Sequence, residues 1–240
     1  MTSSIHALDT SRSPRSDLVL RSALTRTERD EMFALLSTWF TNVGRTVFER
    51  DLAEKEWVIL LRDDDESIAG FSTLMLMEVD GVPVFFSGDT IVAPHRWGTF
   101  DLPRLWGRHV FSVARELAAP DVYWFLISSG YRTYRFLPLF FREFHPGPGG
   151  ETPLAVKHLL DRIATAKFGE GYEPRSGVVR LATPAPLRPG LSDPALRIER
   201  NAWVRFFVEA NPGHAAGDEL ACLVRVAQEN LTAAGLRMLR

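Results

Sequence analysis

Runs of hydrophobic residues along the chain follow either the spacing of helices or the spacing of strands, and polar breaks separate them. Short apolar or alternating runs bounded by turn residues are typical of strands. They predict strands at 17–24, 57–64, 68–81, 84–94, 121–130, 177–182, 202–210 and 219–226. Apolar residues three and four apart are typical of helices. They predict helices at 26–42, 45–56, 102–118, 131–144 and 154–168, and a short helix closing the chain.

Local signals support several of these boundaries. Thr25 and Glu28 have the spacing of a capping box, so the first helix begins there. Pro94 cannot donate to a strand ladder and ends the strand before it. Pro103 suits the first turn of the next helix, and Pro138 predicts a kink within 131–144.

The clearest break in the pattern is "HPGPGGETP" at 145–153, and residues 170–200 are rich in Pro, Gly and Arg. The strand pair expected after this stretch can extend the sheet of the first half. We therefore expect a disordered tail at 1–16 and a single domain at 17–240, with an insertion at about 146–201.

Composition narrows the class of protein. Hydrophobic residues make up 45% and charged residues 24% of the 240 residues, as in soluble globular proteins. The net charge of −2 gives no field that would favour nucleic acid or an anionic membrane. Cys222 is the single cysteine, so no intrachain disulfide forms. The excess of Arg over Lys is typical of a GC-rich, bacterial genome. With no secretory h-region and no apolar run of membrane length, we expect a cytoplasmic protein without a membrane partner.

Candidate chemistry begins at "TIVAPHRWGTF", residues 90–100, where a strand runs into a loop and then a helix. A helix N-terminus offers N–H groups and a partial positive charge to an anion. Gly98 lets the backbone approach a ligand closely, and Arg96 can pair with phosphate.

The order of elements and "IVAPHRWG" resemble the Gcn5-related N-acetyltransferase (GNAT) superfamily, over about residues 17–145 and 202–226. The resemblance implies an α+β fold with a central mixed, mostly antiparallel sheet flanked by helices. It also implies transfer of an acyl group, from acetyl-CoA or another acyl-CoA, to the amine of a small molecule or a protein.

The loop departs from the family's pattern. Arg96 stands one residue early, and Phe100 and Leu102 occupy the usual glycine positions. Asp101 brings a negative charge to the expected phosphate site or caps the helix. Two alternatives therefore stay open: an enzyme of this fold with an acyl carrier protein or aminoacyl-tRNA as donor, and a GNAT-like binding protein without catalysis.

Acyl transfer to an amine needs a base, a donor to the thioester carbonyl and an acid for the thiolate. Asp89 is the candidate base, Tyr134 the first candidate acid and Tyr131 the second. The alternatives are that Asp89 pairs with an arginine or caps a bulge beside Gly88, and that the tyrosine rings pack. By resemblance, the carbonyl donor is a backbone N–H near Ile91 to Ala93.

The remaining candidates surround these groups. The expected donor-binding residues are Ile91, Val92, Ala93, Arg96, Trp97, Gly98, Thr99 and Arg104. The polar stretch "SSGYRTYR" supplies Ser128, Ser129 and Arg132 for substrate. "FLPLFF" (136–141), with Trp97 and Trp106, fits either an acyl pocket or plain core. The histidines lack metal-ligand spacing, so we expect no metal. The apolar last strands allow a homodimer.

Overall fold

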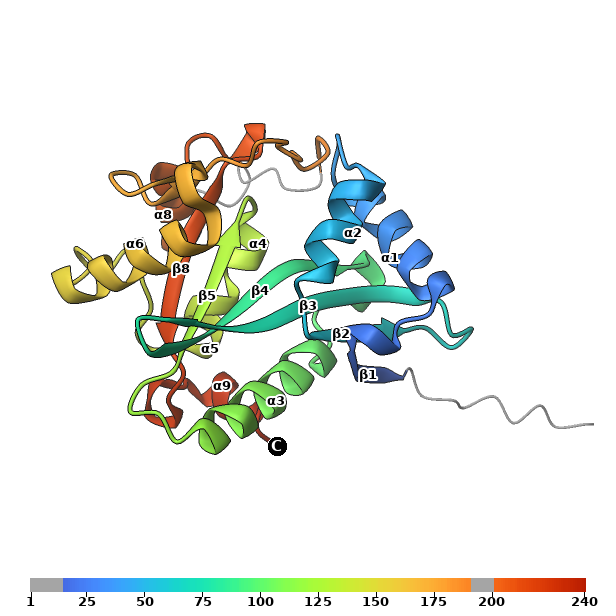
Figure 1. The fold of residues 1–240 in the computed structure, drawn as a ribbon, viewed down its shortest axis with the longest axis horizontal. Coiled ribbons are helices and arrows are strands. Elements are labelled where there is room, and N and C mark those ends of the chain that lie inside the picture. Colours follow the sequence, from blue (N-terminus) through green and yellow to red (C-terminus); the bar gives the residue numbers. More distant parts are fainter. Residues whose placement is uncertain (1–14, 191–200) are drawn as a thin grey trace, which may run out of the picture.

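The strands predicted from both halves of the chain join one sheet. The computed structural model describes residues 15–190 and 201–240, and in them the sheet has eight strands in the order β1-β2-β3-β4-β5-β8-β7-β6 (Figure 1). Neighbouring strands in this described sheet are antiparallel, except that β4 and β5 are parallel. The strands are β1 (Ser16–Leu20), β2 (Trp57–Arg62), β3 (Ile68–Val79), β4 (Val82–Val92), β5 (Tyr123–Ser128), β6 (Tyr172–Glu173), β7 (Val178–Val179) and β8 (Glu219–Arg225).

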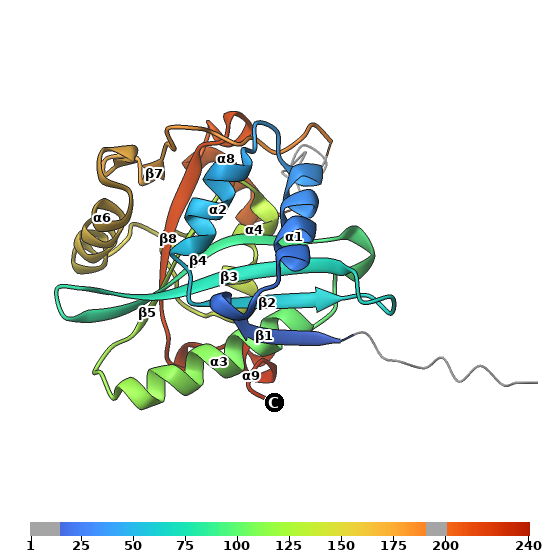
Figure 2. The same ribbon diagram turned by 45° about the vertical axis from the view of Figure 1, so that its right-hand side comes forward.

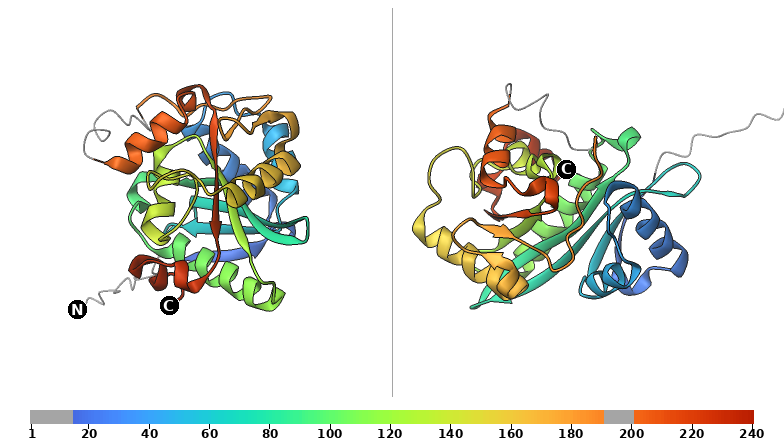
Figure 3. Two further views of the ribbon diagram at one scale, coloured as in Figure 1. Left: turned by 90° about the vertical axis from the view of Figure 1, so that its left-hand side faces the viewer. Right: turned by 90° about the horizontal axis from the view of Figure 1, so that it is seen from above.

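Helices cover both faces of this sheet (Figures 2 and 3). They are α1 (Arg26–Trp39), α2 (Arg45–Ala53), α3 (Asp101–Leu117), α4 (Tyr131–Tyr134), α5 (Phe136–Phe140), α6 (Leu154–Phe168), α8 (Ala202–Ala210) and α9 (Ala233–Arg237). Buried side chains of α1, α2 and α6 pack on one face, and those of α3, α4, α5, α8 and α9 pack on the other. The predicted α+β fold with a mixed, mostly antiparallel sheet is confirmed.

The central strand β2 shows why its sequence is apolar throughout. Val58 and Leu60 face α1 and α2, whereas Ile59 and Leu61 face α3. All four side chains are fully buried, because a strand with helices on both faces has no solvent side. At the start of α1, the capping box is present, and Glu28 N–H donates to Thr25 Oγ1 at 3.1 Å.

Residues 202–210 form helix α8, so the strand predicted there is wrong. The side chain of Asn201 caps the helix by accepting from the N–H groups of Trp203 at 3.0 Å and Val204 at 3.3 Å. Val204 and Phe207, three residues apart, are the buried residues. This helical spacing outweighs the strand propensity of "AWVRFFVEA".

The single helix predicted at 131–144, with a kink at Pro138, is also wrong. The chain forms the short helices α4 and α5, and it is extended after Phe140. Phe141 forms a bridge with Leu231 and His145 forms one with Leu223, so tertiary pairing takes the last residues out of the helix. Pro138 lies within α5, where its ring lacks the N–H that a longer helix needs.

The segment predicted as an insertion, 146–201, contributes to the sheet through residues 146–190, and its residues 191–200 lie outside the described residues. Its β7 pairs with β8, and its α6 covers Phe86 and Phe125. Residues 184–188 then cross to the end of α1, where Thr41 N–H donates to the Pro186 carbonyl at 2.9 Å. The expected tail at 1–16 lies outside the described residues up to residue 14, and Ser16 already belongs to β1. The division into domains stays a prediction.

Candidate active site

A gap opens in the sheet where β4 and β5 separate. The two strands pair over Val84–Ser87 and Tyr123–Leu126 and then diverge (Figure 1). Ser72 pairs with Thr90 and Leu74 with Ser87. Gly88 and Asp89 therefore both oppose Thr73, which makes a β-bulge beside the gap. Strand edges without a neighbour leave backbone groups free for a ligand, so this gap is the candidate site.

A cavity of about 390 Å³ occupies the gap, within the range of small-molecule sites. Its walls come from the end of β4, the loop into α3, and the segment from the end of β5 through α5. Leu187, from the segment that crosses to α1, closes another side. The predicted residues that line it are Ile91, Val92, Arg96, Trp97, Gly98, Thr99, Ser129 and Arg132.

A smaller cavity of about 40 Å³ lies next to the first and shares Thr90 and Thr133 with it. Its walls are mainly aromatic, with Trp106 from α3 and Trp124 from β5. The indole of Trp124 donates to Ser87 Oγ at 2.9 Å. The sequence allows these aromatic residues to form either an acyl pocket or part of the core. In the structure they border a cavity and also belong to the core.

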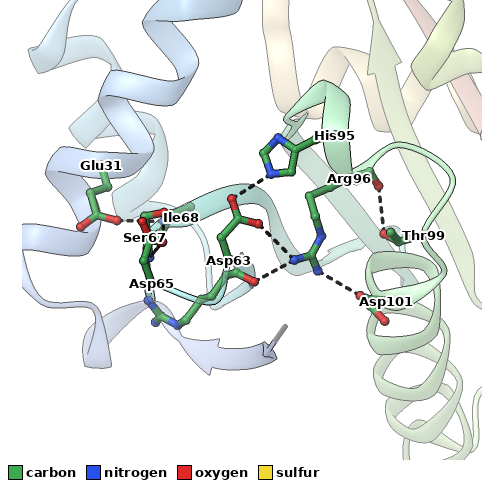
Figure 4. A network of polar contacts seen from close by, with 10 residues as sticks. Glu31, Asp63, Asp65, Ser67, Ile68, His95, Arg96, Thr99 and Asp101 are labelled. Carbon is green, nitrogen blue, oxygen red and sulfur yellow. Dashed lines mark hydrogen bonds and ion pairs between the residues drawn. The ribbon is translucent and has the colours of Figure 1, made fainter. Parts of the chain in front are cut away.

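Arg96 is held within the protein (Figure 4). Its guanidinium donates to the carbonyl of Arg62 at 2.8 Å, to Asp63 at 3.3 Å and to Asp101 at 3.1 Å. His95 contacts the other oxygen of Asp63 at 2.8 Å. Only 6% of the Arg96 side chain is exposed, and two carboxylates balance its charge. The prediction that Arg96 pairs with a donor phosphate is therefore not supported, and Asp101 serves as its partner rather than as a helix cap.

Trp97 and Arg132 form one side of the cavity. The Trp97 indole donates to the Val92 carbonyl at 2.7 Å, and the Arg132 guanidinium lies 4.0 Å from the centre of the Trp97 ring. Two predicted donor-binding residues are outside the cavity. Ala93 N–H donates to Ala69 at 2.8 Å, and the side chain of Arg104 is 44% exposed on α3. Neither supports the predicted role.

The two candidate acids lie in the core. Tyr134 is fully buried, and its hydroxyl donates to the Pro146 carbonyl at 2.9 Å. Burial raises the pKa of Tyr134 far above its usual range. Tyr131 is 3% exposed and, like Tyr134, lies outside both cavities. Neither tyrosine is placed to protonate a thiolate, and the alternative that their rings pack is the observed one.

Replacing Tyr134 with Phe tests this correction. We expect Tyr134→Phe to keep the rate of transfer within about threefold, because the lost hydroxyl bonds only a backbone carbonyl. The free energy of unfolding should fall by about 1 kcal/mol, the usual value of one hydrogen bond. Steady-state rates and denaturant titration measure both; a hundredfold loss of rate with unchanged stability would restore Tyr134 as the acid.

The two predicted serines differ. Ser128 is buried, and its hydroxyl donates to the Gly130 carbonyl at 2.7 Å, outside both cavities. Its predicted contact with substrate is not supported. Ser129, the next residue, lines the larger cavity.

Asp89 stands at the bulge among charged residues from other elements. It is half-buried, and its side chain lines neither cavity. Burial, reinforced by the charge of Asp51 and opposed by that of Lys55, raises the pKa of Asp89 to about 7. The Lys55 ammonium is itself buried and lies 2.7 Å from Asp51. Burial and the charge of Asp89 raise the pKa of Glu219 to about 8.

Sequence reasoning missed Lys55, Glu219 and the cavity-lining Arg135. Glu219 begins β8, 130 positions after Asp89 in the numbering. Lys55 is one of three lysines in an arginine-rich chain, and this rarity was the available signal.

Among the described residues, no group of three or more His, Cys, Asp or Glu side chains is arranged to hold a metal. No described helix is long and apolar enough to cross a membrane.

Comparison with known proteins yields structural matches. A scan of protein families and a search of curated proteins give no match to the sequence. A probable N-acyltransferase from Enterococcus faecalis is 18% identical, with a TM-score of 0.41, over 54% of this chain and 33% of that one. The GNAT family N-acetyltransferase YhbS from Escherichia coli, in complex with CoA, is 14% identical, with a TM-score of 0.37, over 53% of this chain and 70% of that one.

A third match is N-acetylglutamate synthase from Neisseria gonorrhoeae, complexed with coenzyme A and N-acetylglutamate. It is 15% identical, with a TM-score of 0.38, over 66% of this chain and 34% of that one. The present chain thus spans about a third of the length of two of these proteins. The matched structures include members of the GNAT family, which is the family that the order of elements resembles.

Proposed function

We propose that the protein is an N-acyltransferase that moves an acyl group from a thioester donor to an amine, and that the two substrates meet at the gap between β4 and β5. The proposal rests on two features that meet at the β-bulge, namely the cavities and the carboxylate of Asp89. The cavities lie on the α3 side of the sheet, and the carboxylate of Asp89 lies near Lys55, which follows α2.

The donor arm occupies the larger cavity. The carbonyl of Val92 accepts from Trp97, which lines the cavity. Because the N–H and C=O of a residue in an antiparallel strand point to the same side, the Val92 N–H faces the cavity as well. It is the candidate donor to the thioester carbonyl, one residue from Ala93, whose N–H is already bonded. The smaller aromatic cavity takes a short acyl chain.

Asp89 acts as the base. With its pKa at about 7, the carboxylate of Asp89 can take a proton, near neutral pH, from the ammonium group of the amine that receives the acyl group. The amine nitrogen then attacks the carbonyl carbon, the C–N bond forms and the C–S bond breaks. The thiolate leaves without a dedicated acid, since an ordinary thiol has a pKa of about 8.5. It regains the proton held by Asp89 through water, and the attacking nitrogen releases its second proton to solvent, which balances the reaction.

Thiol release tests the proposal. The protein is mixed with acetyl-CoA, longer acyl-CoAs and acyl-pantetheine thioesters, each with and without a panel of primary amines, and free thiol is followed by its reaction with a disulfide dye. We expect at least one donor to give thiol release that depends on the amine, with the amide product identified by mass spectrometry. If no thioester gives amine-dependent release, the proposed function is wrong.

The pH profile should follow the charges around Asp89. Activity requires the carboxylate, so it rises with pH up to the pKa of about 7 and levels off above it. Asp51→Asn removes a negative charge that raises this pKa, so the profile moves to lower pH. We expect activity at pH 6 to rise about two- to threefold relative to the plateau.

Rate against pH from 5 to 9 measures the profile of the wild type and the Asp51→Asn variant. Arg108→Ala is the control, because Arg108 is exposed on α3 and outside both cavities. It should leave the midpoint unchanged. A midpoint that Asp51→Asn leaves in place would mean that a group other than Asp89 controls the rate.

A further inference from the structure

The first turn of α3 is poorly suited to hold a pyrophosphate. Asp101 is its first residue and is negative. Pro103 has no N–H, and the N–H of Arg104 already donates to the Phe100 carbonyl at 3.0 Å. Phe100 and Leu102 bring apolar side chains to the cavity wall. An anion with two or three charges would therefore meet few N–H donors and a carboxylate, instead of a favourable helix dipole.

The loop before α3 offers no spare positive charge either. Arg96 is its buried cation, and the carboxylates of Asp63 and Asp101 are both bonded to it (Figure 4). One positive charge against two negative charges leaves the network without attraction for a phosphate. Breaking it to free the guanidinium would leave buried charges unpaired, which is costly.

Within the described residues, positive charge without a carboxylate partner lies on the cavity wall instead. Arg132 and Arg135 both line it from the segment after β5. Within the described residues, neither guanidinium has a carboxylate in contact, and the Nε of Arg132 is buried without any hydrogen-bond partner. The Arg132 guanidinium lies 4.0 Å from the centre of the Trp97 ring. Such a planar fork matches a phosphate group.

We propose that the donor is a thioester on a 4′-phosphopantetheine arm that ends in a single phosphate, and that Arg132 and Arg135 bind this phosphate. The proposal rests on the proposed function. The arm enters past Trp97 with its phosphate on the two arginines, and its thioester reaches the bulge at Gly88. The adenosine diphosphate part of CoA gains no site on α3.

Binding measurements test this directly. Isothermal titration gives the Kd of the full chain for pantetheine, 4′-phosphopantetheine, CoA and a carrier protein bearing the 4′-phosphopantetheine arm. We expect 4′-phosphopantetheine to bind at least tenfold more tightly than pantetheine, and no more weakly than CoA. Arg132→Ala and Arg135→Ala should each lose about tenfold for 4′-phosphopantetheine and nothing for pantetheine. Arg108→Ala, on exposed α3 surface, should leave every Kd unchanged.

Two outcomes would overturn the proposal. The first is CoA binding more than tenfold more tightly than 4′-phosphopantetheine, because that would place the pyrophosphate on a site of its own. The second is equal affinity for pantetheine and 4′-phosphopantetheine. Circular dichroism of each variant separates loss of binding from loss of fold, and the unchanged affinity for pantetheine is a second check.

The titration with the carrier protein identifies the source of the phosphate. If the carrier protein binds more tightly than free 4′-phosphopantetheine, the phosphate site serves a donor carried on a protein. If the two bind equally, the phosphate site serves a small thioester. Thiol release separates this proposal from the function itself. Transfer from acetyl-CoA with preferred CoA binding would retain the function and overturn the donor. Arginine-dependent binding without transfer to any amine would retain the phosphate site and overturn the function.

Discussion

Asp89→Asn is expected to lower the rate of amine acylation by about a hundred- to a thousandfold, within the usual range for loss of a general base. The amide keeps the size of the carboxylate but cannot take the proton of the amine. Donor affinity should stay the same, because the Asp89 side chain lines neither cavity. The turnover rate from thiol release and the donor Kd from calorimetry measure the two effects separately.

The control for this variant is Asp121→Asn. Asp121 is a half-exposed surface aspartate paired with Arg225 at 3.2 Å, away from the bulge, and its loss should change the rate less than twofold. The pH profile adds a second readout, because residual activity of Asp89→Asn should lose the rise toward pH 7 that the carboxylate causes. A rate within tenfold of the wild type, with the rise intact, would remove Asp89 from the mechanism.

The sequence predicted the frame of this site well, because local patterns define it. β4 ends at Val92, two residues before Pro94, and Trp97 and Gly98 of the loop that follows line the cavity. Alternation of apolar residues and proline punctuation depend on the residues themselves and their neighbours.

Partners that are distant in sequence explain the predictions that failed. Arg96 looks like a phosphate ligand until the turn after β2 brings Asp63 against it, 33 positions away in the numbering. Tyr134 looks like an acid until the Pro146 carbonyl meets its hydroxyl. In both cases a non-local contact decided which group the polar side chain bonds.

The same limit explains the residues that were missed. Glu219 enters the site because β8 inserts between β5 and β7, and this strand order follows from the whole sheet. Arg135 lines the cavity because the helix predicted at 131–144 stops early and leaves two short helices. Electrostatic clusters of this kind depend on topology, so sequence spacing alone does not reveal them.

Arg96→Ala is expected to destabilise the fold rather than to weaken donor binding. The substitution leaves the carboxylates of Asp63 and Asp101 without their shared cation and the Arg62 carbonyl without its donor. Loss of one partner of a buried ion pair costs about 3–5 kcal/mol. Because both carboxylates are 32% exposed to water, we expect a smaller loss in the free energy of unfolding here, of about 2–3 kcal/mol. For a chain of this length the Tm then falls by about 5–10 °C.

Denaturant and thermal unfolding measure this effect, and Arg104→Ala provides the matched control. Arg104 lies 4.0 Å from Asp101 with its side chain 44% exposed, so its removal should change the free energy of unfolding by less than about 0.5 kcal/mol. Asp101→Asn in the Arg96→Ala background should restore part of the lost stability, because the unpaired negative charge is then gone. If Arg96→Ala instead unfolds like the wild type and loses affinity for CoA, the guanidinium is free in solution to bind a donor phosphate, and the ion-pair network is not what holds this loop.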